Sequence, residues 1–200
     1  MSQFIDFLSR IIKILNEISL NYVVVGGVAV IISGRPRTTT DLDLIVEKDI
    51  NKIKKFIERL KQMDFDVSQD QIDYALKEGF QLSIFDNRSF LRIDLTVAST
   101  KNHRNALNSA REAVFNKLTI KIPSIEEILY GKILYIGRIE DVEKKELLEY
   151  NDVIDFIVIY NANNKSINIE QLRAMVSGVG LLGTLNRILK LNEEDSKKKM

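Results

Sequence analysis

The chain has 200 residues, a formal net charge of +1, 45% hydrophobic residues and no cysteine. This length corresponds to one domain, or to one domain with a small extension, so a large multidomain assembly is excluded. The lack of cysteine excludes disulfide bonds, thiol nucleophiles and thiolate metal sites. The near-neutral charge gives the whole molecule no field for binding nucleic acid or membranes, and with a single histidine any metal ion must be bound by oxygen ligands.

The first half of the chain alternates helical and strand patterns. Apolar residues at steps of three and four predict an amphipathic helix over residues 4–18. Residues 22–25 predict a short strand that stops at Gly26-Gly27, and a short helix follows up to Gly34. Further patterns predict strands at residues 41–46, 65–67, 80–85 and 91–97, and a second amphipathic helix at residues 50–60.

The second half is helical in pattern. Ser124 followed by Glu127 matches a capping box, which predicts a helix up to about residue 136. Helical spacing continues over residues 142–160 and 169–191. We therefore expect an α/β (α+β) domain over residues 1–120, a helical subdomain packed on it over residues 121–193, and a disordered tail over residues 194–200.

The sequence also bears on location. No apolar run is long enough to span a bilayer, and residues 1–10 lack the basic region and the uninterrupted apolar stretch of a signal peptide. We expect a cytoplasmic protein with no membrane partner.

Two carboxylates stand out in the strand predicted at residues 41–46. Residues two apart in a strand point to the same face, so Asp41 and Asp43 lie side by side. Two unit charges about 4 Å apart repel each other by roughly 4 kcal/mol at an effective dielectric constant near 20. Such a pair is stable when it is exposed, or when a cation lies between the carboxylates. Mg²⁺ is the natural candidate because it binds carboxylates together with substrate phosphates.

A third carboxylate and a glycine pair complete the pattern. Asp94 lies in another predicted strand with the same Asp-Leu pairing. If the two strands are neighbours, the three carboxylates can hold cations for phosphoryl or nucleotidyl transfer, and Asp94 can accept a proton from an attacking hydroxyl. Gly26 and Gly27 lie between a strand and a helix, where bare backbone N–H groups can approach a phosphate.

These motifs resemble the DNA-polymerase-β-like nucleotidyltransferase superfamily. The resemblance rests on Gly26-Gly27, on the run Gly-Arg-Pro-Arg-Thr-Thr-Thr-Asp-Leu-Asp-Leu over residues 34–44, and on Ile-Asp-Leu over residues 93–95. Within the superfamily the sequence looks most like the AbiEii-type and minimal nucleotidyltransferases of toxin–antitoxin systems. The resemblance implies a mixed β-sheet nucleotidyltransferase core flanked by helices, with a C-terminal helical subdomain.

The resemblance also implies roles for individual residues. Gly26 and Gly27 would contact the nucleotide phosphates, and Asp41, Asp43 and Asp94 would be the catalytic residues and the ligands of Mg²⁺ or Mn²⁺. Residues 122–132 are similar to the segment in which the family carries a lysine that reaches the triphosphate, which makes Lys132 a nucleotide-binding candidate.

Other interpretations of these residues stay open. Lys132 also fits a lysine that extends from an apolar helix to solvent. Asp152 and Asp155 fit helix N-terminal charges or ion-pair partners for Lys132 and Arg138. Arg35 and Arg37, in the loop before Asp41, are candidates for contact with phosphate or an RNA backbone, or are solvated loop residues.

The implied function is that of a Mg²⁺-dependent nucleotidyltransferase. It would move a nucleoside monophosphate group from a nucleoside triphosphate such as ATP to a hydroxyl of a protein, a tRNA or a small molecule. The AbiEii-type resemblance adds a role in a toxin–antitoxin pair, with an antitoxin as partner. The alternative is a non-catalytic protein that keeps the fold and binds a nucleotide or a partner. A nuclease or phosphatase that uses the same carboxylates is a third hypothesis.

Overall fold

The computed structural model of the protein describes residues 3–79 and 81–198. The chain divides into two compact units. The first unit comprises Met1–Ile32 and Arg37–Ser124, and the second comprises Ser33–Pro36 and Ile125–Met200. Four residues, Ser33–Pro36, therefore belong to the second unit, and the first unit resumes at Arg37, four residues before Asp41. The domain boundaries predicted at residues 120 and 193 stay predictions.

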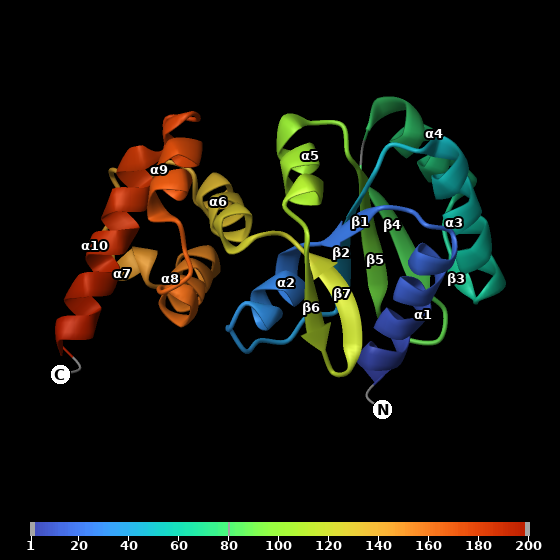
Figure 1. Ribbon diagram of the computed structural model, residues 1–200, viewed down its shortest axis with the longest axis horizontal. Helices are drawn as coiled ribbons and strands as arrows, with labels where there is room; N and C mark the ends of the chain where they lie inside the picture. Colours follow the sequence, from blue (N-terminus) through green and yellow to red (C-terminus); the bar gives the residue numbers. More distant parts are fainter. Residues whose placement is uncertain (1–2, 80, 199–200) are drawn as a thin grey trace. The chain divides into compact units, whose positions relative to one another are not determined.

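A five-stranded mixed sheet forms the centre of the first unit (Figure 1). Its strand order is β1-β2-β5-β4-β3; β2 and β5 run parallel, and the other neighbouring pairs are antiparallel. The bounds are Tyr22–Val24 for β1, Asp41–Val46 for β2, Phe65–Asp66 for β3, Leu82–Asp86 for β4 and Arg92–Val97 for β5. This mixed α+β architecture confirms the predicted fold class. Phe80, at the start of the strand predicted over residues 80–85, lies outside the described residues.

Five helices belong to the first unit within its described residues: α1 (Gln3–Glu17), α2 (Gly26–Ile32), α3 (Ile50–Gln62), α4 (Gln69–Glu78) and α5 (Lys101–Asn108). Helix α1 buries most of the predicted apolar stripe, namely Phe7, Leu8, Ile11, Ile14 and Leu15, and it contacts α3. It also buries Ile5 and Ile12, whereas Phe4 and Ile18 of the predicted stripe are only partly buried. Helix α3 begins after Asp49, whose side chain accepts a hydrogen bond from the backbone N–H of Lys52. The sequence patterns did not predict α4 or α5.

A β-hairpin follows the central sheet and was also not predicted. Strands β6 (Arg111–Phe115) and β7 (Leu118–Ile122) pair in antiparallel fashion, and β7 contacts β1. The two linking residues, Asn116 and Lys117, have φ angles of 47° and 71°. Positive φ at both positions is the requirement of the tightest hairpin turn, which Asn-Gly satisfies most easily. Because lysine stands where glycine is usual, the turn has no clear sequence signal.

The second unit is helical. It contains α6 (Ile125–Ile136), α7 (Lys144–Leu147), α8 (Asn151–Asn163), α9 (Ile169–Ser177) and α10 (Leu182–Lys198). Helix α6 packs against α8 and α9, and α10 contacts the same two helices. The tail predicted over residues 194–200 overlaps the end of α10, and residues 199–200 lie outside the described part of the chain. Among the helices of the described residues, none combines the length and the apolar character needed to cross a membrane.

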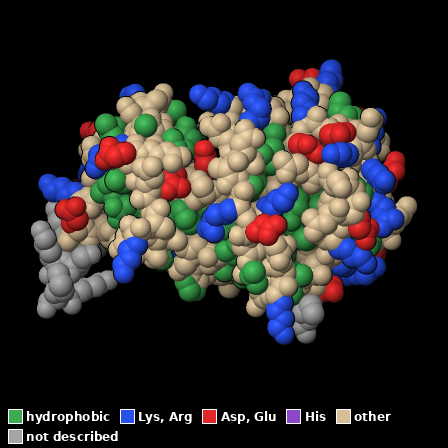
Figure 2. Space-filling model, in the orientation of Figure 1, with side chains coloured by type: hydrophobic (Ala, Val, Ile, Leu, Met, Phe, Trp, Pro, Cys, Tyr) green, Lys and Arg blue, Asp and Glu red, His purple; other side chains and the backbone are tan. Residues whose placement is uncertain are grey.

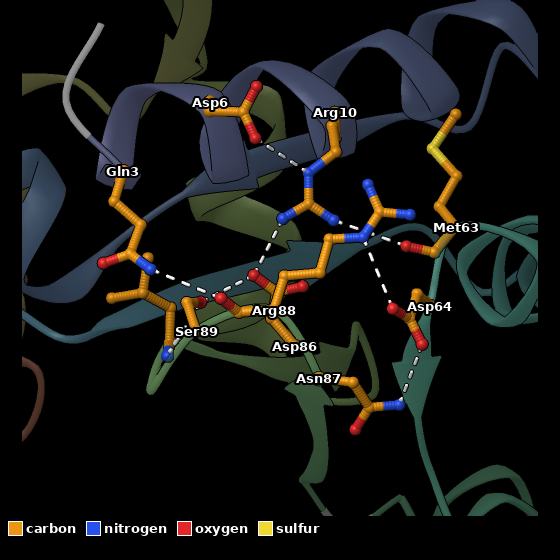
Figure 3. A network of polar contacts seen from close by, with 10 residues as sticks. Gln3, Asp6, Arg10, Met63, Asp64, Asp86, Asn87, Arg88 and Ser89 are labelled. Carbon is orange, nitrogen blue, oxygen red and sulfur yellow. Dashed lines mark hydrogen bonds and ion pairs between the residues drawn. The ribbon is translucent and has the colours of Figure 1, made fainter.

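A buried ion pair joins α1 to the end of β4 (Figure 3). Nη2 of Arg10 lies 2.7 Å from Oδ2 of Asp86, whose side chain is 1% exposed, and the guanidinium lies over the ring of Phe65. The hydroxyl of Ser89 donates to the same carboxylate oxygen at 2.6 Å. These contacts hold the connection between β4 and β5 against α1, so β5 starts from an anchored turn.

The surface carries both signs of charge. Figure 2 shows Lys and Arg side chains interspersed with Asp and Glu on the face that it draws. Ion pairs between exposed or partly exposed side chains include Lys52 with Glu47 at 2.8 Å and Arg59 with Glu17 at 2.9 Å. This distribution agrees with the formal net charge of +1.

Candidate active site

Strand pairing brings the predicted carboxylates together. Asp43 of β2 and Asp94 of β5 are direct partners in the parallel ladder. Asp41, two residues before Asp43, shares its face of the sheet. Asp94 is buried, whereas Asp41 and Asp43 are partly exposed. The sequence placed Asp41 and Asp43 side by side, and the pairing of β2 with β5 adds Asp94 to them.

Arg92 bridges two of these carboxylates. It is the ladder partner of Asp41 and lies two residues before Asp94. Its Nε is 3.0 Å from Oδ2 of Asp94, and its Nη2 is 3.4 Å from Oδ2 of Asp41. The sequence motifs assigned no role to Arg92. The available signal was its spacing from Asp94, since residues two apart share a strand face.

Each carboxylate also accepts a hydrogen bond from a neutral donor. The hydroxyl of Thr39 donates to Oδ1 of Asp41 at 2.7 Å, and the hydroxyl of Ser83 donates to Oδ1 of Asp94 at 2.8 Å. The backbone N–H of Gly27 donates to the carboxylate of Asp43. Phosphate contact by the N–H groups of Gly26 and Gly27 stays a prediction.

Negative charge accumulates at Asp43. Burial is the main cause that raises its pKa to about 6, from an ordinary value of 3.8, and the charges of Asp41 and Asp94 raise the pKa further. The hydrogen bond from Gly27 and the charge of Arg92 oppose this shift without cancelling it. The carboxylate of Asp43 therefore lies where an additional positive charge is stabilising.

The glycine pair lies against the carboxylates. Gly26 is exposed and has a φ angle of +58°, and a Cβ atom on it would lie 1.8 Å from Oδ2 of Asp43. Gly27 is buried, and a Cβ atom on it would lie 2.6 Å from Oγ1 of Thr39. Side chains at these positions would occupy the space of the site residues. Both glycines are thus explained by close approach of the backbone.

The donor chemistry of the site fits a hard divalent cation. Within residues 3–79 and 81–198, no group of three or more His, Asp or Glu side chains is arranged to hold a metal ion. Mg²⁺ does not need such a group, because one or two carboxylates suffice when water and substrate phosphates complete its coordination. Asp41 and Asp43 supply two carboxylates on one strand face, in a region of excess negative charge. These two residues would hold the cation, and a ligand role for Asp94 stays a prediction.

The remaining candidates lie elsewhere in the chain. Lys132 belongs to the second unit, where its Nζ is 2.7 Å from both Oδ1 of Asp152 and Oδ2 of Asp155. Arg35 pairs with the same buried Asp155 and donates to the carbonyl of Asn151 at 2.7 Å. Lys132 thus has the ion-pair partners that the structural interpretation expected. Arg37 is exposed in the first unit, and nucleotide contact by Lys132 and Arg37 stays a prediction.

Known proteins share this architecture. One is ANT(2")-Ia, in a crystal structure with adenylyl-2"-tobramycin, which superposes on this chain with a TM-score of 0.61. The two sequences are 14% identical, and the match covers 88% of this chain and 97% of the ANT(2")-Ia chain. The chain has a nucleotidyltransferase fold. An antigenic nucleotidyltransferase-like protein from Paracoccidioides brasiliensis is 20% identical over 90% of this chain and 87% of its own, with a TM-score of 0.52. The lincomycin-bound lincosamide antibiotic adenylyltransferase LnuA is 13% identical over 78% of this chain and 95% of its own, with a TM-score of 0.51.

A family model agrees with the fold over the first part of the chain. Residues 2–88 match a family described as "Nucleotidyltransferase of unknown function (DUF6036)". The matched segment contains Gly26, Gly27, Asp41 and Asp43 of the candidate site and ends before Asp94. No curated protein matches the chain by sequence. Assignment to the AbiEii branch stays a prediction.

Proposed function

We propose that the protein transfers the AMP group of ATP to a hydroxyl of a small-molecule acceptor, with Mg²⁺ or Mn²⁺ held by Asp41 and Asp43. The observation that carries the proposal is the register of β2 and β5, in which Asp43 faces Asp94 on the strand next to it. AMP and a small-molecule acceptor are favoured by two structures of the same fold. One contains adenylylated tobramycin, and the other is a lincosamide adenylyltransferase with bound lincomycin.

The proposed reaction is a substitution at the α-phosphorus. The acceptor oxygen forms a bond to the α-phosphorus, the bond from this phosphorus to the oxygen that bridges to the β-phosphate breaks, and pyrophosphate leaves. Asp94 accepts the proton of the acceptor hydroxyl. Ser83 and Arg92 orient the carboxylate of Asp94 through its two oxygens. When bound, the cation supplies positive charge that offsets the charge of the phosphates.

Nucleotide binding is proposed for Gly26, Gly27 and Arg37, all of which belong to the first unit. Gly26 lets the carboxylate of Asp43 lie directly against the backbone, because a Cβ atom on the glycine would lie 1.8 Å from Oδ2 of Asp43. Arg37 lies in the exposed loop that leads into β2, four residues before Asp41. Lys132 is already paired with two carboxylates, which favours a structural role for it. An antitoxin partner, a role in a toxin–antitoxin pair and a cytoplasmic location find no support in the structure or in the comparisons and stay predictions.

Labelled ATP tests this function. The full chain is incubated with Mg²⁺ or Mn²⁺ and with ATP labelled at either the α- or the γ-phosphate. The acceptors are an aminoglycoside, a lincosamide, a mixture of small metabolites, tRNA and a protein extract. We expect label from the α-phosphate to appear on a small molecule and label from the γ-phosphate to appear in pyrophosphate. Asp41→Asn and Asp43→Asn should abolish transfer.

A matched control distinguishes site chemistry from general charge loss. Asp64 is an exposed carboxylate of the same unit, paired with Arg88 at 3.4 Å, and its positive φ angle suits asparagine. Asp64→Asn should therefore leave transfer unchanged. Release of the γ-label as inorganic phosphate would show a phosphatase instead. Label on tRNA or protein alone would reject the small-molecule acceptor. ATP binding without transfer to any acceptor would favour the non-catalytic alternative.

A further inference from the structure

Arg92 holds oxygen atoms beside the proposed cation site. Its guanidinium pairs with Oδ2 of Asp94 and with Oδ2 of Asp41, which come from two different strands. The side chain of Arg92 is 46% exposed, whereas that of Asp94 is 9% exposed. The partly exposed guanidinium of Arg92 therefore pairs with the largely buried carboxylate of Asp94. The guanidinium can leave toward solvent without crossing the core.

A divalent cation at Asp41 meets this guanidinium directly. The divalent cation and the guanidinium of Arg92 would both bind the carboxylate oxygens of Asp41, and two positive groups at one carboxylate repel each other. Binding of the divalent cation thus weakens the contact of Arg92 with Asp41. The released N–H groups then need new acceptors. The guanidinium fork matches phosphate oxygens, which reach the same place when a nucleotide binds with the cation.

We propose that Arg92 is an internal counter-ion that couples the binding of the divalent cation to the binding of the triphosphate. Without nucleotide, Arg92 competes with the cation for Asp41. With nucleotide, Arg92 transfers its hydrogen bonds to phosphate oxygens, and the competition ends. The nucleotide part rests on the proposed function, whereas competition for the cation concerns the nucleotide-free protein alone.

Cation affinity without nucleotide provides the first test. Mn²⁺ is titrated into the full-length protein, and free Mn²⁺ is measured by electron paramagnetic resonance. Arg92→Gln removes the charge and the fork, whereas Arg92→Lys keeps the charge and loses the fork. We expect Arg92→Gln to bind Mn²⁺ about tenfold more tightly than the unaltered chain, with Arg92→Lys between the two.

A matched arginine serves as the control. Arg88 lies in the connection between β4 and β5 and pairs with Asp64 rather than with a site carboxylate. Arg88→Gln should leave Mn²⁺ affinity unchanged. Thermal unfolding of each variant shows whether it is folded, and Arg92→Lys carries the test if Arg92→Gln is not. Equal or weaker Mn²⁺ binding by the Arg92 variants, or no Mn²⁺ binding by any chain, overturns the proposal.

The coupling is measured with a non-hydrolysable ATP analogue. In the unaltered chain the analogue should tighten Mn²⁺ binding by a larger factor than in Arg92→Gln, because only the former gains the guanidinium–phosphate contacts. An equal factor in the two chains overturns the coupling. If the Mn²⁺ results hold and no acceptor is labelled in the transfer assay, the counter-ion role stands and the proposed function fails. If an acceptor is labelled and Mn²⁺ affinity is unchanged in the Arg92 variants, the proposed function stands and the counter-ion role fails.

Discussion

Gly26 and Asp43 approach each other so closely that a Cβ atom on the glycine would lie 1.8 Å from Oδ2 of the carboxylate. The two residues belong to α2 and β2, and the backbone N–H of Gly27 donates to the same carboxylate. The backbone at the start of α2 therefore fixes the position of the Asp43 side chain. The glycine is required by this contact as well as by its φ angle of +58°.

Gly26→Ala should consequently displace the carboxylate of Asp43. We expect a loss of about 100-fold in transfer activity, since displacement of a reacting group by 1 Å can cost that much. The left-handed backbone adds a stability cost of about 1–2 kcal/mol. Gly180→Ala is the matched control, because Gly180 has a φ angle of +72° and nothing lies within 4 Å of its Cβ position. It should lower only the unfolding free energy, and full activity of Gly26→Ala would contradict this role of the glycine.

Asp43 should make the metal-free protein less stable as the pH rises. Burial, followed by the charges of Asp41 and Asp94, raises its pKa to about 6 in the folded protein, against 3.8 ordinarily. Between these values the folded protein keeps a proton that the unfolded chain has released. Stability therefore falls as the pH rises from about 4 to about 6, by at most about 3 kcal/mol, and is constant above that range with respect to this group.

Urea unfolding of the metal-free chain across this pH range checks the expectation. Asp43→Asn has no proton to release, so its stability should lack this component of the pH dependence. The difference between the two chains isolates Asp43 from the other titrating groups. Parallel stability curves for the two chains would exclude the raised pKa.

Removal of the charge of Asp155 should lower the free energy of unfolding far more than removal of the charge of Asp152. Asp155 is fully buried and pairs with Lys132 and Arg35, whose side chains are 12% and 16% exposed. Asp155→Asn leaves these two cations without the negative charge, so we expect a loss of about 3–5 kcal/mol in the free energy of unfolding. Asp152→Asn is the control, because Asp152 is 41% exposed and should cost less than about 1 kcal/mol. Equal denaturation midpoints for the two variants would refute this ranking.

The buried pair of Arg10 and Asp86 should stabilise the first unit in a pH-dependent way. Burial raises the pKa of Asp86, but the hydrogen bonds from Arg10 and Ser89 and the charge of Arg10 outweigh it, so the pKa lies below its ordinary value. The contribution of the carboxylate is thus fully present above the ordinary pKa and is lost as the pH falls through the folded pKa. Asp86→Asn should cost about 3–5 kcal/mol at pH 7.

The control for this pair shares the same arginine. Asp6 also pairs with Arg10, at 3.3 Å, but its side chain is 65% exposed. Asp6→Asn should therefore change the unfolding free energy by less than about 1 kcal/mol. Urea unfolding from pH 7 down to pH 3 should show the cost of Asp86→Asn shrinking below about pH 4. A cost that does not depend on pH would contradict the lowered pKa.

Local patterns predicted much of the architecture because helix and strand periods are short-range properties. The apolar stripe of α1 and the alternation of β2 both appear in the structure. The β6–β7 hairpin was not predicted from the sequence, because lysine seldom adopts the positive φ angle of its turn at Asn116-Lys117, and because β6 is largely exposed. The helix predicted over residues 142–160 is two helices, α7 and α8.

By itself, the sequence determined that Asp41 and Asp43 share one face, because side chains alternate along any strand. It also indicated the nucleotidyltransferase fold through the order of its glycine and aspartate motifs. Only the tertiary structure decided that β5 lies beside β2, which brings Asp94 and Arg92 to the same carboxylates. The physical reason is that strand order depends on pairing between distant segments. No short-range pattern encodes which two strands meet, or which positive charge lies between them.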